Sequence, residues 1–140
     1  MIEGIMMIIN RSIDIEEEIR KVLTDYKTAY CRPLPEGFTV PCILVQQVGG
    51  TDIDTIDTFE VVLDARAELE ADALELLNDA VGILKAVAAM QTTALRNVAV
   101  NSKASWGVDP VRPELAMCSA RLQVIAHEEQ KEVTKWQHTT

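Results

Sequence analysis

The fold is decided by two neighbouring stretches, Val40-Pro-Cys-Ile-Leu-Val-Gln-Gln-Val-Gly-Gly50 and Thr58-Phe-Glu-Val-Val-Leu-Asp-Ala-Arg66. The first stretch is apolar on both faces, which predicts a central or well-covered strand over residues 38–48. The second stretch alternates apolar and polar residues, which predicts a strand with one buried face. Gly49 and Gly50 are predicted to open an Asp-rich loop between the strands, and a long amphipathic helix is predicted to follow from about Glu68.

Segments on either side extend this hairpin and helix into an α+β domain. Before them, Asp14 is predicted to cap a helix, because Glu17 follows in a capping-box pattern and apolar residues then recur at helical spacing. After them, strands are predicted over residues 95–106 and 116–126, with a Pro-rich turn between them. The order helix, hairpin, helix, hairpin favours a four-stranded, mostly antiparallel sheet with two helices packed on one face.

The length of 140 residues and the hydrophobic content of 48% are typical of one globular domain. We expect a single α+β domain over residues 1–127 and a polar, mobile C-terminal tail over residues 128–140. The opening apolar run, residues 1–9, is too short to span a bilayer and lacks the basic start of a signal peptide. The sequence therefore predicts a soluble protein with no membrane segment.

The charge and the cysteines narrow the functional classes. The formal net charge is −9, so the chain is unsuited to gripping nucleic-acid phosphates, although it could line a path along which DNA slides. Cys31, Cys42 and Cys118 are odd in number and form no CxxC pair. This pattern favours reduced, buried thiols in a cytosolic protein over a disulfide framework or a zinc site.

A search for catalytic and metal-binding motifs finds none. An EF-hand loop that opened at Asp52 would need Gly at position 57 and Glu at position 63, but the chain has Asp57 and Leu63 there. The pattern favours an acidic hairpin loop with Asx turns, and weak adventitious binding of a cation there stays open. Of the two histidines, only His127 could serve a Ser-His-Asp or Cys-His arrangement, and no phosphate-binding glycine loop occurs. We expect no enzymatic activity and no catalytic, cofactor or metal site.

Several residues are candidates for contact with a partner instead. Trp106 precedes a turn, where it either caps the edge of the core or contacts another protein. Trp136 lies in a polar tail with no core to join, so its indole is predicted to contact a neighbouring chain, and the apolar N-terminal run invites the same interpretation. Asp52, Asp54 and Asp57 form the acidic loop and complete the predicted interface residues.

In the order and texture of these segments, residues 12–127 resemble the tail terminator (tail completion) proteins of long-tailed bacteriophages. The likeness lies in an early helix, the Pro-containing strand of residues 40–50, a polar loop, and the strand that leads into Ala67-Glu-Leu-Glu-Ala71. A turn, Trp106-Gly-Val-Asp-Pro110, and a closing strand, Met117-Cys-Ser-Ala-Arg-Leu-Gln-Val-Ile-Ala126, complete it.

The resemblance implies a virion structural protein with no enzymatic activity. Such a protein forms a homo-oligomeric ring, usually a hexamer, on the head-proximal end of the tail tube, after assembly in the host cytoplasm. The ring ends tube polymerisation and offers the surface for head joining, so the implied partners are the tail tube protein and the head-joining connector. DNA passes through its channel without specific binding.

Three alternatives stay open at this point. The first is another neck or head-completion protein. The second is an oligomeric α+β regulatory domain that binds a small ligand between subunits. The third is a small enzyme that uses His127 and nearby carboxylates as acid and base.

Overall fold

The computed structural model describes the backbone of residues 2–53 and 56–138 and the side chains of residues 4–53 and 56–135. Within these residues the chain forms two helices and seven strands: β1 (Ile2–Arg11), α1 (Ile15–Thr24), β2 (Ala29–Cys31), β3 (Cys42–Ile53), β4 (Ile56–Ala67), α2 (Glu70–Met90), β5 (Leu95–Val108), β6 (Ala116–His127) and β7 (Glu129–His138). A five-stranded sheet has the order β2-β3-β4-β6-β5, and β1 pairs with β7 in a separate two-stranded sheet. The protein is therefore α+β, with mostly antiparallel sheets.

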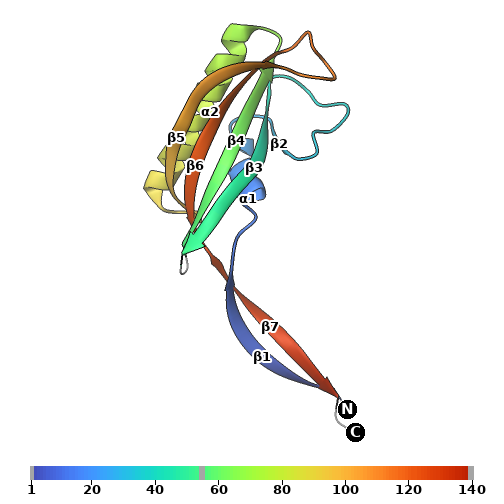
Figure 1. Ribbon diagram of the computed structural model, residues 1–140, viewed down its shortest axis with the longest axis vertical. Coiled ribbons are helices and arrows are strands. Elements are labelled where there is room, and N and C mark those ends of the chain that lie inside the picture. Colours follow the sequence, from blue (N-terminus) through green and yellow to red (C-terminus); the bar gives the residue numbers. More distant parts are fainter. Residues whose placement is uncertain (1, 54–55, 139–140) are drawn as a thin grey trace.

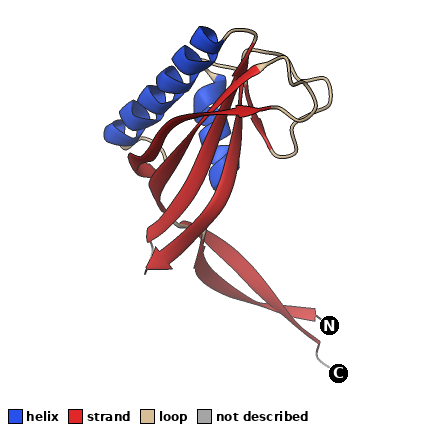
Figure 2. Cartoon of the chain, turned by 45° about the horizontal axis from the view of Figure 1, so that its top comes forward, coloured by secondary structure: helices blue, strands red, loops and turns tan. Residues whose placement is uncertain are grey.

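Both helices lie on the same face of the five-stranded sheet (Figure 1, Figure 2). Helix α1 begins as predicted, because the Asp14 carboxylate accepts the backbone N–H of Glu17 at 3.2 Å. Helix α2 ends at Met90 and is capped by Gln91, whose left-handed φ of 55° closes the last turn. The face that α2 turns to the sheet is small and aliphatic: Ala73, Leu76, Leu77, Ala80, Leu84 and Ala88 are buried.

The main core lies between these helices and the sheet. Alternate residues of β4 and β6 are buried there, as the sequence pattern predicts: Phe59, Val61, Leu63 and Ala65 in β4, and Cys118, Ala120, Leu122, Val124 and Ala126 in β6. Burying a large side chain of this kind contributes about 1.5–3 kcal/mol to folding. The core is aliphatic, in keeping with the small number of aromatic residues.

The sheet differs from the prediction in its strands. It has five strands rather than four, because the short β2 pairs in parallel with β3, from Ala29 opposite Ile43 to Cys31 opposite Val45. The tail that was predicted to be mobile forms β7 over residues 129–138, where its partner is β1. Polar composition alone suggested a loose tail, but pairing with a strand from the other terminus supplies its backbone hydrogen bonds.

The β3–β4 hairpin is longer than predicted, so Asp52 and Asp57 pair across the ladder instead of lying in a loop. The glycines that were predicted to open the loop lie inside β3, where a bulge shifts the register between Gln47 and Gly49. At Gly50 an added Cβ would come within 2.7 Å of a backbone oxygen of β4. Glycine is required there for close approach of the strands rather than for a turn.

A second, smaller apolar cluster forms from Phe38, Cys42 and Leu115. The connection from β5 to β6 contributes Leu115 to this cluster and also carries Asp109. Asp109 is buried, and its carboxylate lies 2.6 Å from the Nε of Arg66 in β4. This pair fixes the connection onto the sheet.

Candidate functional site

Strands β1 and β7 form a ribbon that projects from the domain (Figure 1). The pairing is antiparallel and unbroken, from Ile2 opposite His138 to Arg11 opposite Glu129. At the base of the ribbon the Arg11 Nε lies 2.5 Å from the Glu129 carboxylate. We call this element, residues 2–11 and 129–138, the terminal ribbon.

The terminal ribbon exposes apolar side chains on both of its faces. Its register places Ile5, Met7 and Val133 on one face and Met6 and Ile8 on the other. Four of these, in β1, are 48–67% exposed, and Val133 is 39% exposed. A two-stranded sheet that packs on nothing is marginally stable in water, and clustered exposed apolar residues mark interaction sites. The ribbon is therefore well suited to bury apolar surface against a partner.

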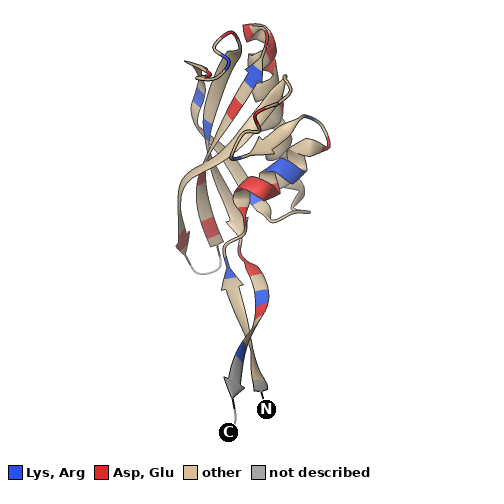
Figure 3. Ribbon diagram, turned by 90° about the vertical axis from the view of Figure 1, so that its right-hand side faces the viewer, with Lys and Arg blue, Asp and Glu red and all other residues tan. Residues whose placement is uncertain are grey.

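The charges of the ribbon are unevenly divided between its strands. Most of its acidic and basic positions lie on β7, and β1 is largely uncharged (Figure 3). Glu129, Lys131, Glu132 and Lys135 alternate in sign along β7. Strand β1 thus contributes most of the exposed apolar side chains of the ribbon, and β7 contributes most of its charged side chains.

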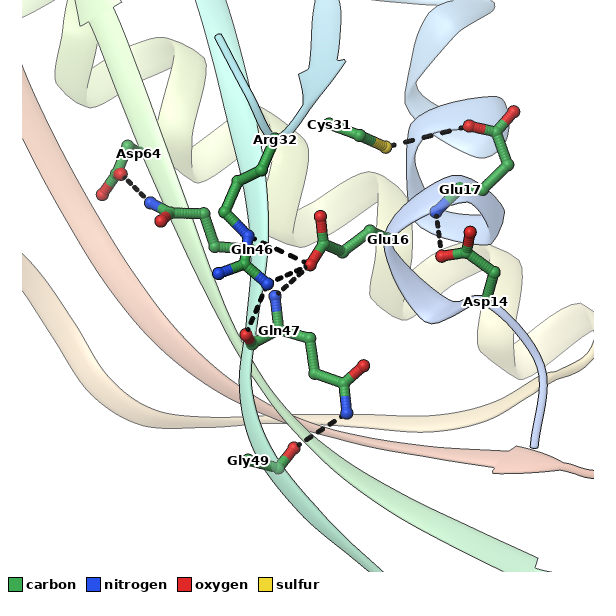
Figure 4. Close-up of polar contacts among 9 residues, drawn as sticks. All are labelled: Asp14, Glu16, Glu17, Cys31, Arg32, Gln46, Gln47, Gly49 and Asp64. Atoms are coloured by element: carbon green, nitrogen blue, oxygen red, sulfur yellow. Dashed lines mark hydrogen bonds and ion pairs between the residues drawn. The ribbon is translucent and has the colours of Figure 1, made fainter.

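The free edge of β3 beyond β2 is closed by side chains rather than by a strand (Figure 4). The Glu16 carboxylate accepts the backbone N–H of Gln47 at 3.0 Å. The Arg32 guanidinium donates to the same Glu16 oxygen at 2.6 Å and to the Gln47 carbonyl at 3.0 Å. Since both backbone groups of Gln47 are occupied, they are not free to pair with another strand at this point of the edge.

Glu16 lies in the first turn of α1 but does not face solvent. Its side chain is only 15% exposed, because α1 packs against β3 and turns Glu16 toward the strand. Burial alone would raise the pKa of Glu16, but the hydrogen bonds from Arg32 and Gln47 outweigh it and lower the pKa. Glu16 is therefore held ionised as an anchor between helix and sheet.

Three carboxylates meet where the terminal ribbon joins the domain. Asp52 and Asp57 lie opposite each other near the tip of the β3–β4 hairpin, and Glu128 lies between β6 and β7. One oxygen from each lies within 4.8 Å of the others. We call these three residues the root cluster. The tip of the β3–β4 hairpin lies beside the base of the terminal ribbon (Figure 1).

The root cluster is electrostatically unbalanced. Asp57 is only 2% exposed, and within the described residues neither of its carboxylate oxygens has a hydrogen-bond partner. Burial, followed by the charges of Asp57 and Asp52, raises the pKa of Glu128. A cavity of about 280 Å³ adjoins Asp52 and Asp57, and Ser12 and Ile13, which lead from β1 into α1, also line it.

The structure separates the residues that were predicted to form an interface. Asp52 is exposed and Asp57 is buried, both at the root of the ribbon, while Asp54 lies outside the described residues. Trp106 is 49% exposed in β5, opposite Cys118, at the end of the domain away from the ribbon. Trp136 lies in β7 opposite Gly4.

Glu128 was missed by the sequence analysis, since no local motif joins it to Asp52 and Asp57. Strand register brings it there: β6 runs beside β4, so that Ala126 lies opposite Asp57 and the chain then turns into the ribbon. Only the pairing of β4 with β6 could have revealed this meeting.

A separate groove of about 680 Å³ is lined mainly by α2, by residues 26–28 before β2 and by residues 39–41 before β3. Its acidic residues are Glu68, Asp72, Glu75 and Asp79, and the last of these pairs with Lys27 at 3.2 Å. No histidine or cysteine is among the described residues that line it. These described residues therefore bring together no pair of nucleophile and imidazole base in the groove.

Of the helices in the described part of the chain, neither is long and apolar enough to span a membrane. The three thiols are free, and burial raises the pKa of each. The chain matches no protein-family model, and a search of the curated proteins found no significant match.

Proposed function

We propose that this protein is the tail terminator of a long-tailed bacteriophage. Copies of the chain assemble into a ring, hexameric in our proposal, that caps the head-proximal end of the tail tube. The ring ends polymerisation of the tube protein and offers the surface to which the head connector joins. The observation that carries this proposal is the terminal ribbon, whose apolar residues are exposed on both faces.

The distribution of exposed apolar residues supports assembly in which one end of a subunit contacts the opposite end of the next subunit. The ribbon lies at one end of the domain, and exposed Leu69, Val108 and Val111 lie at the other. The strand register places them together there, because Val108 and Ala67 both lie opposite Ala116. The two ends are unlike, so contact between them is heterologous. Heterologous contacts generate a closed ring when the rotation from one copy to the next closes on itself.

A neighbouring copy is the occupant that the ribbon suits best. A second copy brings its own apolar residues to the contact, and burial of both sets removes the exposed surface that a lone subunit keeps in water. The contacts of Glu16 and Arg32 with Gln47 disfavour pairing of another strand at that point of β3, and they leave the ribbon free to dock.

The charge of the chain supports the same role. With a formal net charge of −9, a ring of several copies is strongly acidic. Acidic walls repel DNA phosphates, so DNA can pass through the channel without being held. The resemblance to tail terminators in the order of segments over residues 12–127 supplies the specific identity of the assembly.

The proposal is tested by mass and shape. We expect light scattering and negative-stain electron microscopy to find a ring with an open channel, formed at high protein concentration or on addition of tail tube protein. The double variant Met6→Ser/Ile8→Thr should keep the circular dichroism of the domain and lose the ring. The control Thr134→Ser, on the same ribbon face, should assemble normally.

A chain that stays monomeric at high concentration and with tube protein present would count against the ring. So would a double variant that assembles as well as the unmodified chain. Rings that form but do not stop the growth of tail tubes in an assembly reaction would favour another protein of the neck.

A further inference from the structure

Asp57 is the one buried acid that the described structure leaves without a partner. Asp64 is also buried, but it accepts hydrogen bonds from Gln46 and Ser119. Asp109 is paired with Arg66. In contrast, both oxygens of Asp57 are buried without any hydrogen-bond partner among the described residues. A buried carboxylate normally has hydrogen bonds, a counter-charge or a metal ion. The unpartnered oxygens of Asp57 are therefore available to bind a ligand.

The surroundings of Asp57 supply more negative charge instead of a counter-charge. The nearest ionisable groups of the root cluster are Asp52 and Glu128, with one oxygen of each within 4.8 Å of the others. Among the side chains of residues 4–53 and 56–135, no Lys or Arg forms an ion pair with any of the three. Three convergent carboxylates that have no Lys or Arg partner are suited to bind a cation from solution.

The spacing of the oxygens fits a hard divalent ion. Ca²⁺ takes oxygen ligands at about 2.3–2.6 Å, so two oxygens on opposite sides of one ion lie up to about 5 Å apart. Every donor in the root cluster is an oxygen, which suits Ca²⁺ or Mg²⁺ better than a metal that prefers nitrogen or sulfur. The adjoining cavity of about 280 Å³ leaves room for water molecules to complete the coordination.

We propose that Asp52, Asp57 and Glu128 bind a divalent cation, Ca²⁺ or Mg²⁺, at the root of the terminal ribbon. This proposal stands on the geometry of the root cluster and does not depend on ring formation. The ion joins the tip of the β3–β4 hairpin to the junction of β6 and β7. It therefore fixes the direction in which the ribbon leaves the domain, and it relieves the repulsion among the three carboxylates.

The test is calorimetric titration of the full chain, freed of metal with EDTA, with CaCl₂ and separately with MgCl₂. We expect one site with a dissociation constant on the order of 10⁻⁴ to 10⁻³ M, as in sites with few protein ligands. Glu128→Gln should weaken binding by about tenfold or more, because it removes a charged ligand. Glu132→Gln is the matched control: it removes one negative charge from an exposed position of β7, outside the root cluster, and should bind as the unmodified chain does.

Thermal unfolding gives a second measurement. Without metal, Asp57→Asn should unfold at a higher temperature than the unmodified chain, since it removes a buried negative charge that has no partner. Added Ca²⁺ or Mg²⁺ should raise the unfolding temperature of the unmodified chain and of Glu132→Gln, and leave that of Asp57→Asn unchanged.

Three results would overturn the proposal. The first is an absence of binding by the unmodified chain at millimolar concentrations of either ion. The second is equal weakening by Glu128→Gln and Glu132→Gln, which would indicate diffuse attraction to an acidic surface. The third is full retention of binding by a folded Asp57→Asn variant.

Discussion

Replacing Asp109 by Asn should destabilise the protein by about 3–5 kcal/mol, because it breaks a buried ion pair and leaves one partner charged. The carboxylate of Asp109 lies 2.6 Å from the Arg66 Nε, and the two side chains are only 3% and 7% exposed. The Arg66 Nη1 is already buried without a hydrogen-bond partner. Once Asp109 is neutral, the guanidinium keeps its full cost of burial and loses its counter-charge.

The choice of Asn isolates the ion pair from a second role of Asp109. Its other oxygen accepts the backbone N–H groups of Val111 and Arg112 at 2.8 and 2.9 Å and so shapes the connection between β5 and β6. The amide oxygen of Asn keeps these two hydrogen bonds. Asp109→Ala removes them as well, and should cost about 1–3 kcal/mol more than Asp109→Asn for the donors it leaves unpaired.

The effect should depend on pH in one direction. Burial acts to raise the pKa of Asp109, but hydrogen bonds from Arg112, Arg66 and Val111 outweigh it, and the pKa is lowered. A carboxyl whose folded pKa is lowered stabilises the protein above its unfolded pKa of about 3.9. That stability is lost as the pH falls through the folded pKa. The difference between the unmodified chain and Asp109→Asn should therefore be full at neutral pH and shrink below about pH 4.

The assay is urea denaturation at neutral and acidic pH, with the free energy of unfolding taken from the midpoint at constant slope. The control is Asp79→Asn, which breaks the exposed pair with Lys27 and should cost no more than about 1 kcal/mol. If Asp109→Asn costs no more than this control, the buried pair does not anchor the connection and the reasoning fails.

Three further outcomes follow from other contacts. Glu16→Gln should cost about 1.5–3 kcal/mol in urea denaturation, since it removes a charged acceptor that joins α1 to β3, and an unchanged midpoint would refute this. Gly50→Ala should lower the free energy of unfolding by about 1–3 kcal/mol, because the added Cβ would lie 2.7 Å from a backbone oxygen. The control Gly37→Ala, where the added Cβ meets open space, should be close to neutral, and equal effects of the two substitutions would contradict the close approach at Gly50. Burial, and then the charges of nearby Glu side chains, raises the pKa of Cys31 to about 11. Alkylation of Cys31 at pH 8 should therefore be on the order of a hundredfold slower than alkylation of a free thiol, and its rate should increase as the pH is raised toward 11.

The parts of the fold that the sequence predicts correctly are those governed by local patterns. The alternation in residues 116–126 identifies the buried face of β6, and the capping box at Asp14 identifies the start of α1. Both signals depend on neighbours a few residues apart, where periodicity and capping chemistry act. The hairpins and the long helix α2 are found for the same reason.

The parts that the prediction misses depend on partners far apart in the chain. Nothing in residues 129–138 alone says that they form a strand, because their partner is at residues 2–11. The three-residue β2 is likewise too short to have a periodicity of its own. Gly49 and Gly50 were interpreted as a turn signal, but their role is to admit a bulge and a close approach within a ladder. Tertiary pairing overrides the local preference in each case.

The same distinction explains how the acidic hairpin acquires its significance. By sequence, Asp52 and Asp57 belong to a failed EF-hand pattern, and a local motif search has no reason to add a residue from the C-terminal segment. The fold makes Glu128 their neighbour, and does so at the joint between the domain and the terminal ribbon. If the ribbon must reach a neighbouring copy at a set angle, a joint tied by an ion holds that angle better than three mutually repelling carboxylates. Assembly measured with and without EDTA would connect the two proposals: rings that form only with Ca²⁺ or Mg²⁺, and are independent of either ion in Asp57→Asn, would show that the charge of the root cluster controls the ribbon.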